Sequence, residues 1–223
     1  MSIPTAELCA RYRRLYVPAV CDALYWMGLP EQVLPSYLRP LFADKRIAGV
    51  AYTIRGEPIH PQIGRDPGID RITSYLEMFK ELEPDNVLIS VNRDSHVGHL
   101  GELTGNSAQR HGCVGVILDG NLRDIEGLRD IGLQVFYRDL SPLNAIGRWE
   151  MVASQVPVTI GDVTINPGDV VLAEFDGILV IPAADAERVL IHAEEIVGAE
   201  VLVREEMQAG ESPLSSLNRH GYI

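Results

Sequence analysis

The feature that most constrains the fold of this chain is a short apolar run, Val114–Leu118, between two segments with helical patterns. The run has no polar residue, so a strand formed by it must be covered on both of its faces. Strands of this kind lie in the interior of a sheet. We therefore predict a helix–strand–helix unit over residues 101–130, with this strand at its centre.

Glycines and polar residues mark the ends of the flanking helices. Gly112 follows the first helix, where a C-terminal glycine commonly ends one. Asp119-Gly120-Asn121 predicts a loop after the strand, Arg123-Asp124 the beginning of the second helix, and Gly132 its end. Two helix N-termini, at 101–104 and at Asp124, are thus expected close to the end of one strand.

The rest of the chain contains two kinds of connection between strands. Helices are predicted at Ala6–Tyr16, Pro18–Met27 and Arg71–Leu82. Strands are predicted at Ile47–Arg55, Val87–Val91, Leu133–Tyr137, Val156–Ile160, Val163–Asn166, Asp169–Ala173 and Ile178–Ile181. Helices separate the strands in the middle of the chain, and tight turns such as Gly161-Asp162 separate the later ones. The mixture predicts an α+β, layered β/β/α domain over residues 1–223, with its core at about 47–182.

A long helix is predicted near the C-terminus, from Pro182 to Gly210. Its apolar stripe continues by seven residues from Ala193 to Glu200. A carboxylate that is buried on such a stripe must be paired, protonated or bound to a metal, whereas Glu200 is simply solvated if the stripe has ended. The sequence leaves both alternatives open. The tail Pro213–Ile223 has no strong pattern.

Charge and composition exclude several classes of protein. The net charge of −12 argues against binding to nucleic acid or to an anionic membrane, because both need clustered Lys and Arg. No run approaches the length of a membrane span, and the N-terminus lacks the pattern of a secretory signal. Three cysteines without CxxC spacing indicate neither a disulfide framework nor a zinc site. We expect a reduced, cytoplasmic protein.

Two segments without periodicity carry polar residues of undefined role. His60–Asp70 contains Pro and Gly, and loops of this kind are surface connections or lids over a substrate. His96 and His99 have a spacing that metal ligands use on a helix. Gly98 lies between them and favours a loop, so a surface histidine or one that lines a substrate pocket is the alternative.

The start of the helix at Gly101 offers chemistry for binding an anion and a cation together. The first turn, Gly101–Thr104, presents unpaired backbone N–H groups and the positive end of the helix dipole. Arg123 could add a bidentate cationic group for the same anion. Asp124 and Glu102 are oxygen ligands of the kind preferred by Mg²⁺ or Mn²⁺. A metal held there would polarise a carbonyl group and stabilise an enolate.

Each of these residues also has a purely structural interpretation. Asp124 could cap the helix that follows it, which contributes about 1 kcal/mol. Arg123 could form a surface ion pair with Glu126 or Asp119, which contributes little. Glu102 is favoured in a first turn by the helix dipole alone. The residues by themselves leave these alternatives open.

The assembled motifs resemble those of a known family. Gly101-Glu102-Leu103, GVILDGNLRD at 115–124, YRDLSP at 137–142 and NPGDVVLAEFDGILVIP at 166–182 are similar to segments of the regulator of ribonuclease activity A-like family. The resemblance is best over residues 87–182. The catalytic branch of this family is the class II pyruvate aldolase for 4-hydroxy-4-methyl-2-oxoglutarate and 4-carboxy-4-hydroxy-2-oxoadipate.

The resemblance implies a β/β/α swivelling-type domain that assembles as a homotrimer or homohexamer. It implies that Asp124 binds Mg²⁺ or Mn²⁺ directly and that Arg123 holds the pyruvyl carboxylate or enolate. Backbone amides of Gly101, Glu102 and Leu103 would complete the carboxylate site. Glu102, and Glu200 from a neighbouring subunit, would hold the metal through water.

The resemblance therefore implies a metal-dependent lyase that releases pyruvate from a 2-oxo acid, with possible decarboxylation of oxaloacetate. Gly127 departs from the family pattern, which has an acidic residue there. Two other functions compete: a non-catalytic, protein-binding regulator, and a related enzyme acting on another sugar-acid-derived 2-oxo acid. The presence of Asp124 and of the long C-terminal helix favours an enzyme over a regulator.

Overall fold

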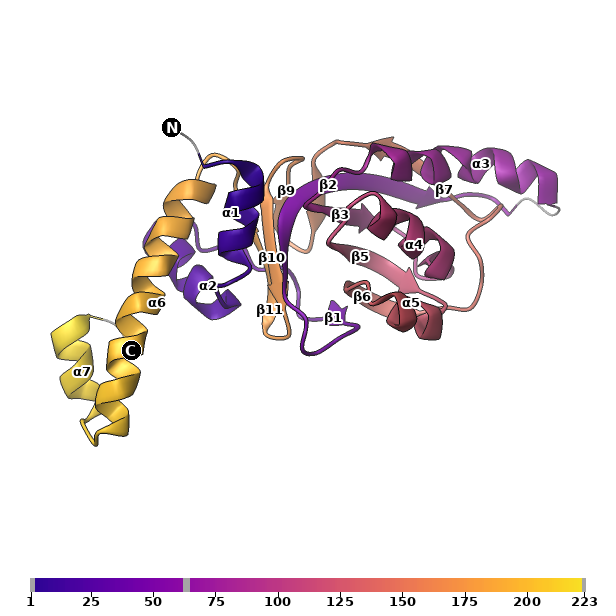
Figure 1. The fold of residues 1–223 in the computed structure, drawn as a ribbon. Coiled ribbons are helices and arrows are strands. Elements are labelled where there is room, and N and C mark those ends of the chain that lie inside the picture. Colours follow the sequence, from indigo (N-terminus) through magenta and orange to yellow (C-terminus); the bar gives the residue numbers. More distant parts are fainter. Residues whose placement is uncertain (1–2, 62–64, 222–223) are drawn as a thin grey trace.

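The computed structural model describes residues 3–61 and 65–221, and its centre is a curled mixed sheet of nine strands (Figure 1). The strands of this sheet are β1 (Arg39–Pro40), β2 (Ile47–Pro58), β3 (Asn86–Val91), β4 (Gly98–Leu100), β5 (Gly115–Leu122), β6 (Val135–Leu140), β7 (Trp149–Ser154), β10 (Val170–Glu174) and β11 (Gly177–Ile181). A separate hairpin consists of β8 (Val158–Ile160) and β9 (Val163–Ile165). The helices are α1 (Thr5–Tyr12), α2 (Val17–Trp26), α3 (Arg65–Met78), α4 (Glu102–Arg110), α5 (Ile125–Ile131), α6 (Ala186–Gln208) and α7 (Pro213–His220). A 3₁₀ turn, η1 (Phe79–Glu81), follows α3.

The sheet has a parallel centre and antiparallel ends. Its order is β1-β6-β5-β3-β2-β10-β11, with β4 paired to β5 and β7 paired to β2. Strands β2, β3, β5 and β6 are parallel, as connections through helices require. The long strand β2 pairs with β10 over its first residues and with β7 over its last ones. One strand therefore joins the two halves of the sheet.

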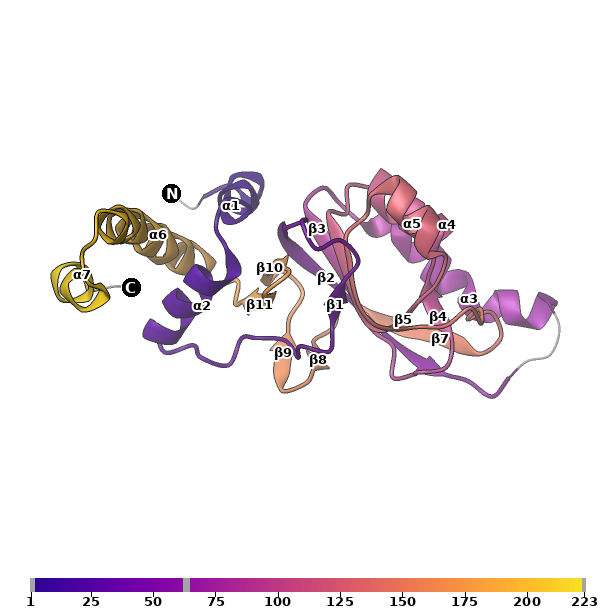
Figure 2. The same ribbon diagram turned by 90° about the horizontal axis from the view of Figure 1, so that it is seen from below.

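Both faces of the parallel strands are covered, as the apolar run at residues 114–118 predicted. Val116 and Leu118 of β5 pack in the cluster formed with α3, α4 and α5. Ile117 lies on the opposite face, in a cluster with Val158 and Ile160 of the β8–β9 hairpin. Figure 2 shows α4 and α5 on one side of the sheet and the hairpin on the other. The predicted β/β/α layering is confirmed.

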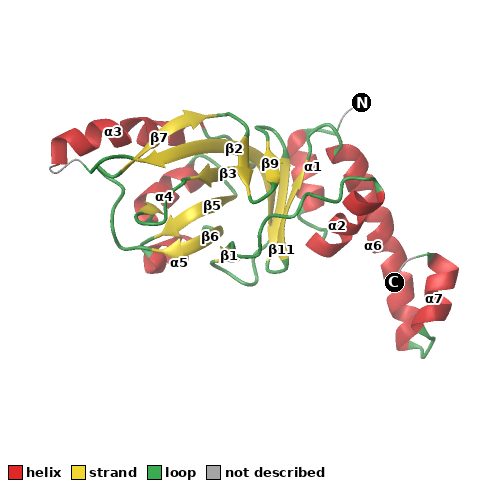
Figure 3. Ribbon diagram, turned by 180° about the vertical axis from the view of Figure 1, so that it is seen from behind, coloured by secondary structure: helices red, strands yellow, loops and turns green. Residues whose placement is uncertain are grey.

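A third apolar cluster covers the antiparallel end of the sheet. There α1, α2 and the first half of α6 pack on β10 and β11 (Figure 3). The long C-terminal helix is thus present, at residues 186–208 within the predicted 182–210. None of the helices that the structure describes is long and apolar enough to span a membrane.

The last turns of α6 and the short helix α7 lie clear of the sheet (Figure 1). α7 packs on α6 through one carboxylate, Glu206, which accepts hydrogen bonds from the Ser216 hydroxyl at 2.5 Å and from Arg219 at 2.5 Å. Ser216 is the buried residue of α7, and Val203 is the last buried residue of α6. Few apolar contacts hold this end of the chain.

Some boundaries differ from those predicted. The tail was wrongly interpreted as unpatterned: Ser212 caps α7 by accepting the Ser215 N–H at 3.1 Å, and Pro213 occupies the first turn. The prediction of a loop at Asp119-Gly120-Asn121 was also wrong. Strand β5 continues through these residues to Leu122, and it pairs with β6 again after a register shift.

The segment His60–Asp70 is only in part the predicted loop. The helix α3 already begins at Arg65, and residues 62–64 lie outside the described residues. Strand β7 was not predicted at all. Its side chains alternate poorly in hydrophobicity, and its place is fixed by pairing with β2.

A bulge in β2 makes room for the largest buried side chain. Trp149 of β7 is fully buried. The β2–β7 register shifts between Arg55 and Gly56, and a Cβ at Gly56 would lie 1.8 Å from Cζ2 of Trp149. Gly56 is therefore required for this indole to pack against the strand.

We expect Gly56→Ala to lower the free energy of unfolding by about 3 kcal/mol or more, since the added methyl overpacks a rigid site. Gly198 in α6 is a matched control, because a Cβ there meets nothing within 4 Å. Gly198→Ala should raise the free energy of unfolding by about 0.5–1 kcal/mol through helix propensity. Urea denaturation of the three proteins measures both effects. Equal stabilities for Gly56→Ala and the wild type would show that the strand yields at this point.

Candidate functional site

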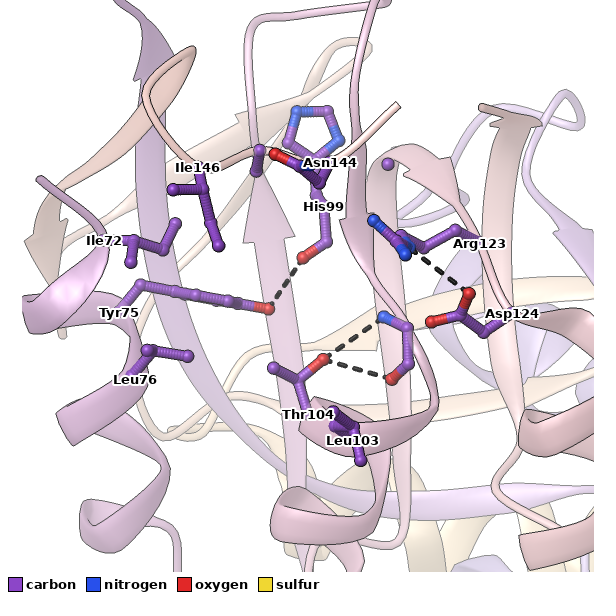
Figure 4. A pocket seen from close by; sticks show the side chains of 13 residues that line it. Ile72, Tyr75, Leu76, His99, Leu103, Thr104, Arg123, Asp124, Asn144 and Ile146 are labelled. Atoms are coloured by element: carbon purple, nitrogen blue, oxygen red, sulfur yellow. Dashed lines mark hydrogen bonds and ion pairs between the residues drawn. The ribbon is translucent and has the colours of Figure 1, made fainter. Parts of the chain in front are cut away.

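The residues singled out from the sequence converge on a pocket of about 250 Å³ at the N-terminus of α4 (Figure 4). Its walls come from α3, from the β4–α4 junction, from the β5–α5 junction and from the loop before β7. The lining residues are Ile72, Tyr75, Leu76, Gly98, His99, Gly101, Leu103, Thr104, Arg123, Asp124, Asn144, Ala145 and Ile146. Of the site residues predicted from the sequence, the structure brings together Gly101, Leu103, Thr104, Arg123 and Asp124.

The first turn of α4 is closed by a hydroxyl group. Thr104 Oγ1 accepts the Gly101 N–H at 3.2 Å and donates to the Gly101 carbonyl at 3.1 Å. The amide of Gly101 is therefore already bonded. The N–H groups of Glu102, Leu103 and Thr104, which have no acceptor within a helix, are the ones that remain for an anion.

Gly101 allows the carboxylate of Asp124 to lie directly against the start of α4. A Cβ at Gly101 would come within 2.4 Å of Asp124 Oδ2. Any side chain at this position would displace the carboxylate. The negative charge of Asp124 thus lies beside the positive end of the α4 dipole, which is a favourable electrostatic interaction.

Asp124 does not cap the helix that it precedes. Its backbone is left-handed, with φ 55° and ψ 46°, and its side chain makes no capping hydrogen bond to α5. A left-handed residue other than glycine is uncommon, and such residues gather at functional sites. The structural interpretation of Asp124 as an N-cap is therefore wrong, and the carboxylate faces the pocket instead (Figure 4).

Arg123 contacts its neighbour rather than the other acids considered. Its Nε lies 3.3 Å from Asp124 Oδ1, and its backbone N–H donates to the Leu100 carbonyl at 2.9 Å. Asp119 is bonded instead to Arg138, at 3.2 Å. The side chains of Arg123 and Asp124 are 33% and 42% exposed, so a ligand can reach both charges.

Glu102 is turned away from this pocket. Its Oε1 accepts a hydrogen bond from Asn106 at 3.1 Å, and a Cβ at Gly127 would lie 2.5 Å from its Cγ. Glu102 thus occupies the space that a side chain at position 127 would need, which accounts for glycine at this position. Its predicted contact with a metal through water stays a prediction.

His99 is a buried, neutral histidine rather than a free ligand. Its Nδ1 accepts the Asn121 N–H at 3.2 Å, and its ring lies edge-on against Trp149. Burial lowers its pKa to about 4, although Asp94, with Oδ2 at 3.2 Å from Nε2, opposes the shift. Asp94 also accepts the N–H of His96 and so shapes the loop.

His96 is exposed, whereas His99 is buried, so the two rings have different surroundings. Within residues 3–61 and 65–221 no group of three or more His, Cys, Asp or Glu side chains is placed to hold a metal. His99 does line the pocket, as the alternative interpretation expected, but it does so with a side chain that is 1% exposed. Its carbonyl accepts the Tyr75 hydroxyl at 3.0 Å (Figure 4).

The carboxylate of Asp124 nevertheless fits the requirements of a hard divalent cation such as Mg²⁺ or Mn²⁺. A single carboxylate that is partly exposed at an open pocket suits Mg²⁺ or Mn²⁺, which retain several waters and need few protein ligands. A closed, all-protein zinc site would need more side chains than the described pocket supplies.

Glu200 lies far from these residues within one chain. It belongs to α6, at the opposite end of the molecule from α4 (Figure 1). Its side chain is 19% exposed, and burial raises its pKa while Arg204 at 3.9 Å opposes the shift. It borders a second cavity with Val203, Met207 and Gln208. The apolar stripe of α6 therefore reaches Glu200 in part.

Two parts of the pocket were not found from the sequence. Leu76 lies within the helix predicted at Arg71–Leu82, but no pattern marked it as a pocket residue; it is 47% exposed and lines the pocket. Asn144 and Ile146, in the loop before β7, were not assigned at all. A Pro142 and a Gly147 at the ends of that loop are the signals that could have marked it.

Comparison with known proteins agrees with the fold. A model of the RraA-like family, described as Aldolase/RraA, matches residues 17–180. The chain belongs to the RraA-like family.

Curated relatives include a protein named "Putative 4-hydroxy-4-methyl-2-oxoglutarate aldolase" from Halalkalibacterium halodurans. It is 26% identical over 87% of this chain and 86% of its own length. Protein DlpA of Legionella pneumophila is 28% identical over 73% of this chain, which spans only about 25% of the length of DlpA.

Two solved structures share the fold. RraAS2 of Streptomyces coelicolor, described as an unusual member of the RNase ES inhibitor RraA protein family, has a TM-score of 0.77 and 25% identity over 92% of this chain and 98% of its own. A structure described among novel cellulases from gut-associated microbes has a TM-score of 0.81 and 31% identity over 90% of this chain and 88% of its own.

We expect the free energy of unfolding to decrease as the pH is lowered, because of His99. The pKa of His99 is about 4 in the folded protein, and it has the ordinary histidine value of about 6.5 in the unfolded chain. Between these values the unfolded chain binds a proton that the folded chain does not, so stability is lost as the pH falls through this window, by up to about 3 kcal/mol. Urea denaturation at about pH 7 and about pH 5 measures the loss.

The contribution of His99 to this loss of stability is measured by comparing variants with the wild type at the two pH values. His99→Gln should lose less stability on acidification than the wild type does. The exposed His111 serves as the control, and His111→Gln should retain the full loss. The same pH dependence in His99→Gln and in the wild type would contradict the assignment.

Proposed function

We propose that this protein is a divalent-metal-dependent lyase that cleaves a C–C bond of a 2-oxo acid and releases pyruvate. The observation that carries the proposal is the contact of Asp124 with Gly101, beside Arg123 and the N-terminus of α4. The guanidinium of Arg123, the free backbone amides of α4 and the accessible carboxylate of Asp124 then face a single small pocket. The names of curated relatives support the same reaction class.

In this proposal the α-carboxylate of the substrate binds between Arg123 and the first turn of α4. The guanidinium presents two parallel N–H donors to a carboxylate, and the α4 amides of Glu102 and Leu103 add uncharged donors. The 2-oxo group then lies next to Asp124. A divalent cation held by Asp124 would supply a Lewis acid for that group.

The charges of the pocket favour the enolate of pyruvate over the bound substrate. When the C–C bond breaks, its electron pair moves toward the 2-oxo oxygen, and negative charge grows there. Arg123 and the positive end of α4 lie close to this charge before it develops, which is the arrangement that lowers a barrier most. Loss of CO₂ from oxaloacetate gives the same enolate, so the same residues would serve a decarboxylase.

A glycoside hydrolase is a poorer fit to the pocket. Most such enzymes need two carboxyl groups on opposite sides of the scissile bond. Asp124 is the single carboxylate among the described lining residues. We therefore place the lyase ahead of the cellulase with which one similar structure is described.

We further propose that Glu200 acts in a homotrimer or homohexamer. Within one chain it is too far from Asp124 to share a ligand with it (Figure 1). Its partial burial and its raised pKa are features of a carboxylate placed for a role beyond solvation. Light scattering and the activity of Glu200→Gln test this part of the proposal.

We expect pyruvate release with Mg²⁺, and its loss in EDTA. Asp124→Asn should lower kcat/KM by about 10²-fold or more, since it removes the anionic ligand and keeps the shape. Asp162, exposed in the β8–β9 turn, is the matched control, and Asp162→Asn should have wild-type activity. A coupled lactate dehydrogenase assay on oxaloacetate and on 4-hydroxy-4-methyl-2-oxoglutarate provides the measurement. No turnover together with no Mg²⁺ binding would favour the protein-binding regulator.

We expect Gly101→Ala to lower kcat/KM by on the order of 10²-fold, because the added Cβ moves the Asp124 carboxylate out of position. Its thermal unfolding should stay close to that of the wild type, since the displaced side chain is exposed. Gly198→Ala adds the same methyl group in open space and should leave activity unchanged. An active Gly101→Ala protein would show that this contact does not place the carboxylate.

A further inference from the structure

The pocket has two chemically different walls. Arg123, Asp124 and the start of α4 form one wall, which is polar and charged. Ile72 and Leu76 of α3 form the opposite wall, and Ile146 lies beside them (Figure 4). Leu76 is 47% exposed and Ile146 is 41% exposed, so both present hydrocarbon to the pocket rather than to the core.

Among the described residues of one chain, the apolar wall carries no charge that could hold a second anionic group. Arg123 is the sole cation among the described residues that line the pocket, since His99 is neutral and buried. Arg148, in the same loop as Ile146, does not line the pocket. Its Nη1 donates to the Asn144 side chain and carbonyl at 3.3 and 3.4 Å and is thereby held by its own loop.

A substrate with a second carboxylate would place that charge against Ile72 and Leu76. Removal of a carboxylate from water without a partner is costly. Asn144 offers a neutral amide and therefore cannot compensate the charge. An apolar group in the same place would instead displace water from the exposed parts of Leu76 and Ile146, at a gain of about 0.8 kcal/mol for each buried methylene.

On the basis of the lyase function proposed above, we propose that the substrate is a 4-hydroxy-2-oxo acid with an uncharged alkyl or aryl group on C4. Its carboxylate binds at Arg123, and the group on C4 lies against Ile72, Leu76 and Ile146. The α3 wall thus selects against the dicarboxylic substrate for which the curated relative is named.

The reaction is a retro-aldol cleavage that needs no further reactant. The C4 hydroxyl loses its proton to water, and the C3–C4 bond breaks. Its electron pair enters the enolate of pyruvate, and C4 becomes the carbonyl carbon of an aldehyde. Uptake of one proton at C3 then gives pyruvate, so each substrate yields one pyruvate and one apolar aldehyde.

The test compares three substrates with the intact protein and Mg²⁺. They are 4-hydroxy-2-oxopentanoate, 4-hydroxy-2-oxooctanoate and 4-hydroxy-4-methyl-2-oxoglutarate. Pyruvate release is followed with lactate dehydrogenase. We expect kcat/KM to rise by about fourfold for each added methylene (~0.8 kcal/mol) and to be lowest for the dicarboxylate.

A lysine at position 76 should reverse this order. Leu76→Lys supplies a cation opposite Arg123, so kcat/KM should rise for the dicarboxylate and fall by about tenfold or more for the octanoate. Leu76→Met keeps an apolar side chain of similar volume and should keep the wild-type order. Leu214→Lys, on the exposed face of α7, is the matched control and should also keep it.

The possible failures are distinguishable. Pyruvate from none of the three substrates would overturn both this inference and the proposed lyase function. A wild-type preference for the dicarboxylate, with no gain from alkyl length, would overturn the inference alone. If Leu76→Lys changed the mass of the protein by light scattering and left the substrate order unchanged, the α3 wall would be a contact between copies of the chain, which also overturns it.

Discussion

The close contact between Gly101 and Asp124 is the constraint on which the arrangement of the site depends. It exists because β4 and β5 are parallel and paired, so that two strand-to-helix junctions meet at one edge of the sheet. The Arg123 N–H continues this ladder by donating to Leu100. Two positive helix ends and two opposite charges are thereby concentrated in one place, and a single methyl group at residue 101 would separate them.

Burial explains why most strands could be predicted. Val116, Ile117 and Leu118 must all leave water, and only a strand between two layers allows this. The end of that strand could not be predicted, because Asp-Gly-Asn is a turn signal by local preference. Gly120 in fact provides space for the side chains of Asn92 and His99, whose positions are set by distant segments. Tertiary packing overrides the local signal there.

The charged half of the site was predictable, and the apolar half was not. Arg123 and Asp124 are neighbours in the sequence at the end of a strand, so their proximity needs no knowledge of the fold. The left-handed backbone of Asp124 is different, since no spacing or periodicity in the sequence indicates it. Leu76 and Ile146 meet only after α3 docks on the sheet, and no periodicity in either segment records that event.

The C-terminal end of the chain has a stability of its own. The last turns of α6 and the helix α7 are joined mainly by polar contacts to Glu206, with little apolar burial. Segments of this kind open locally at a lower free energy than the core. Their amide hydrogens should therefore exchange with solvent while those of β3 and β5 stay protected, so this end can rearrange without disturbing the sheet.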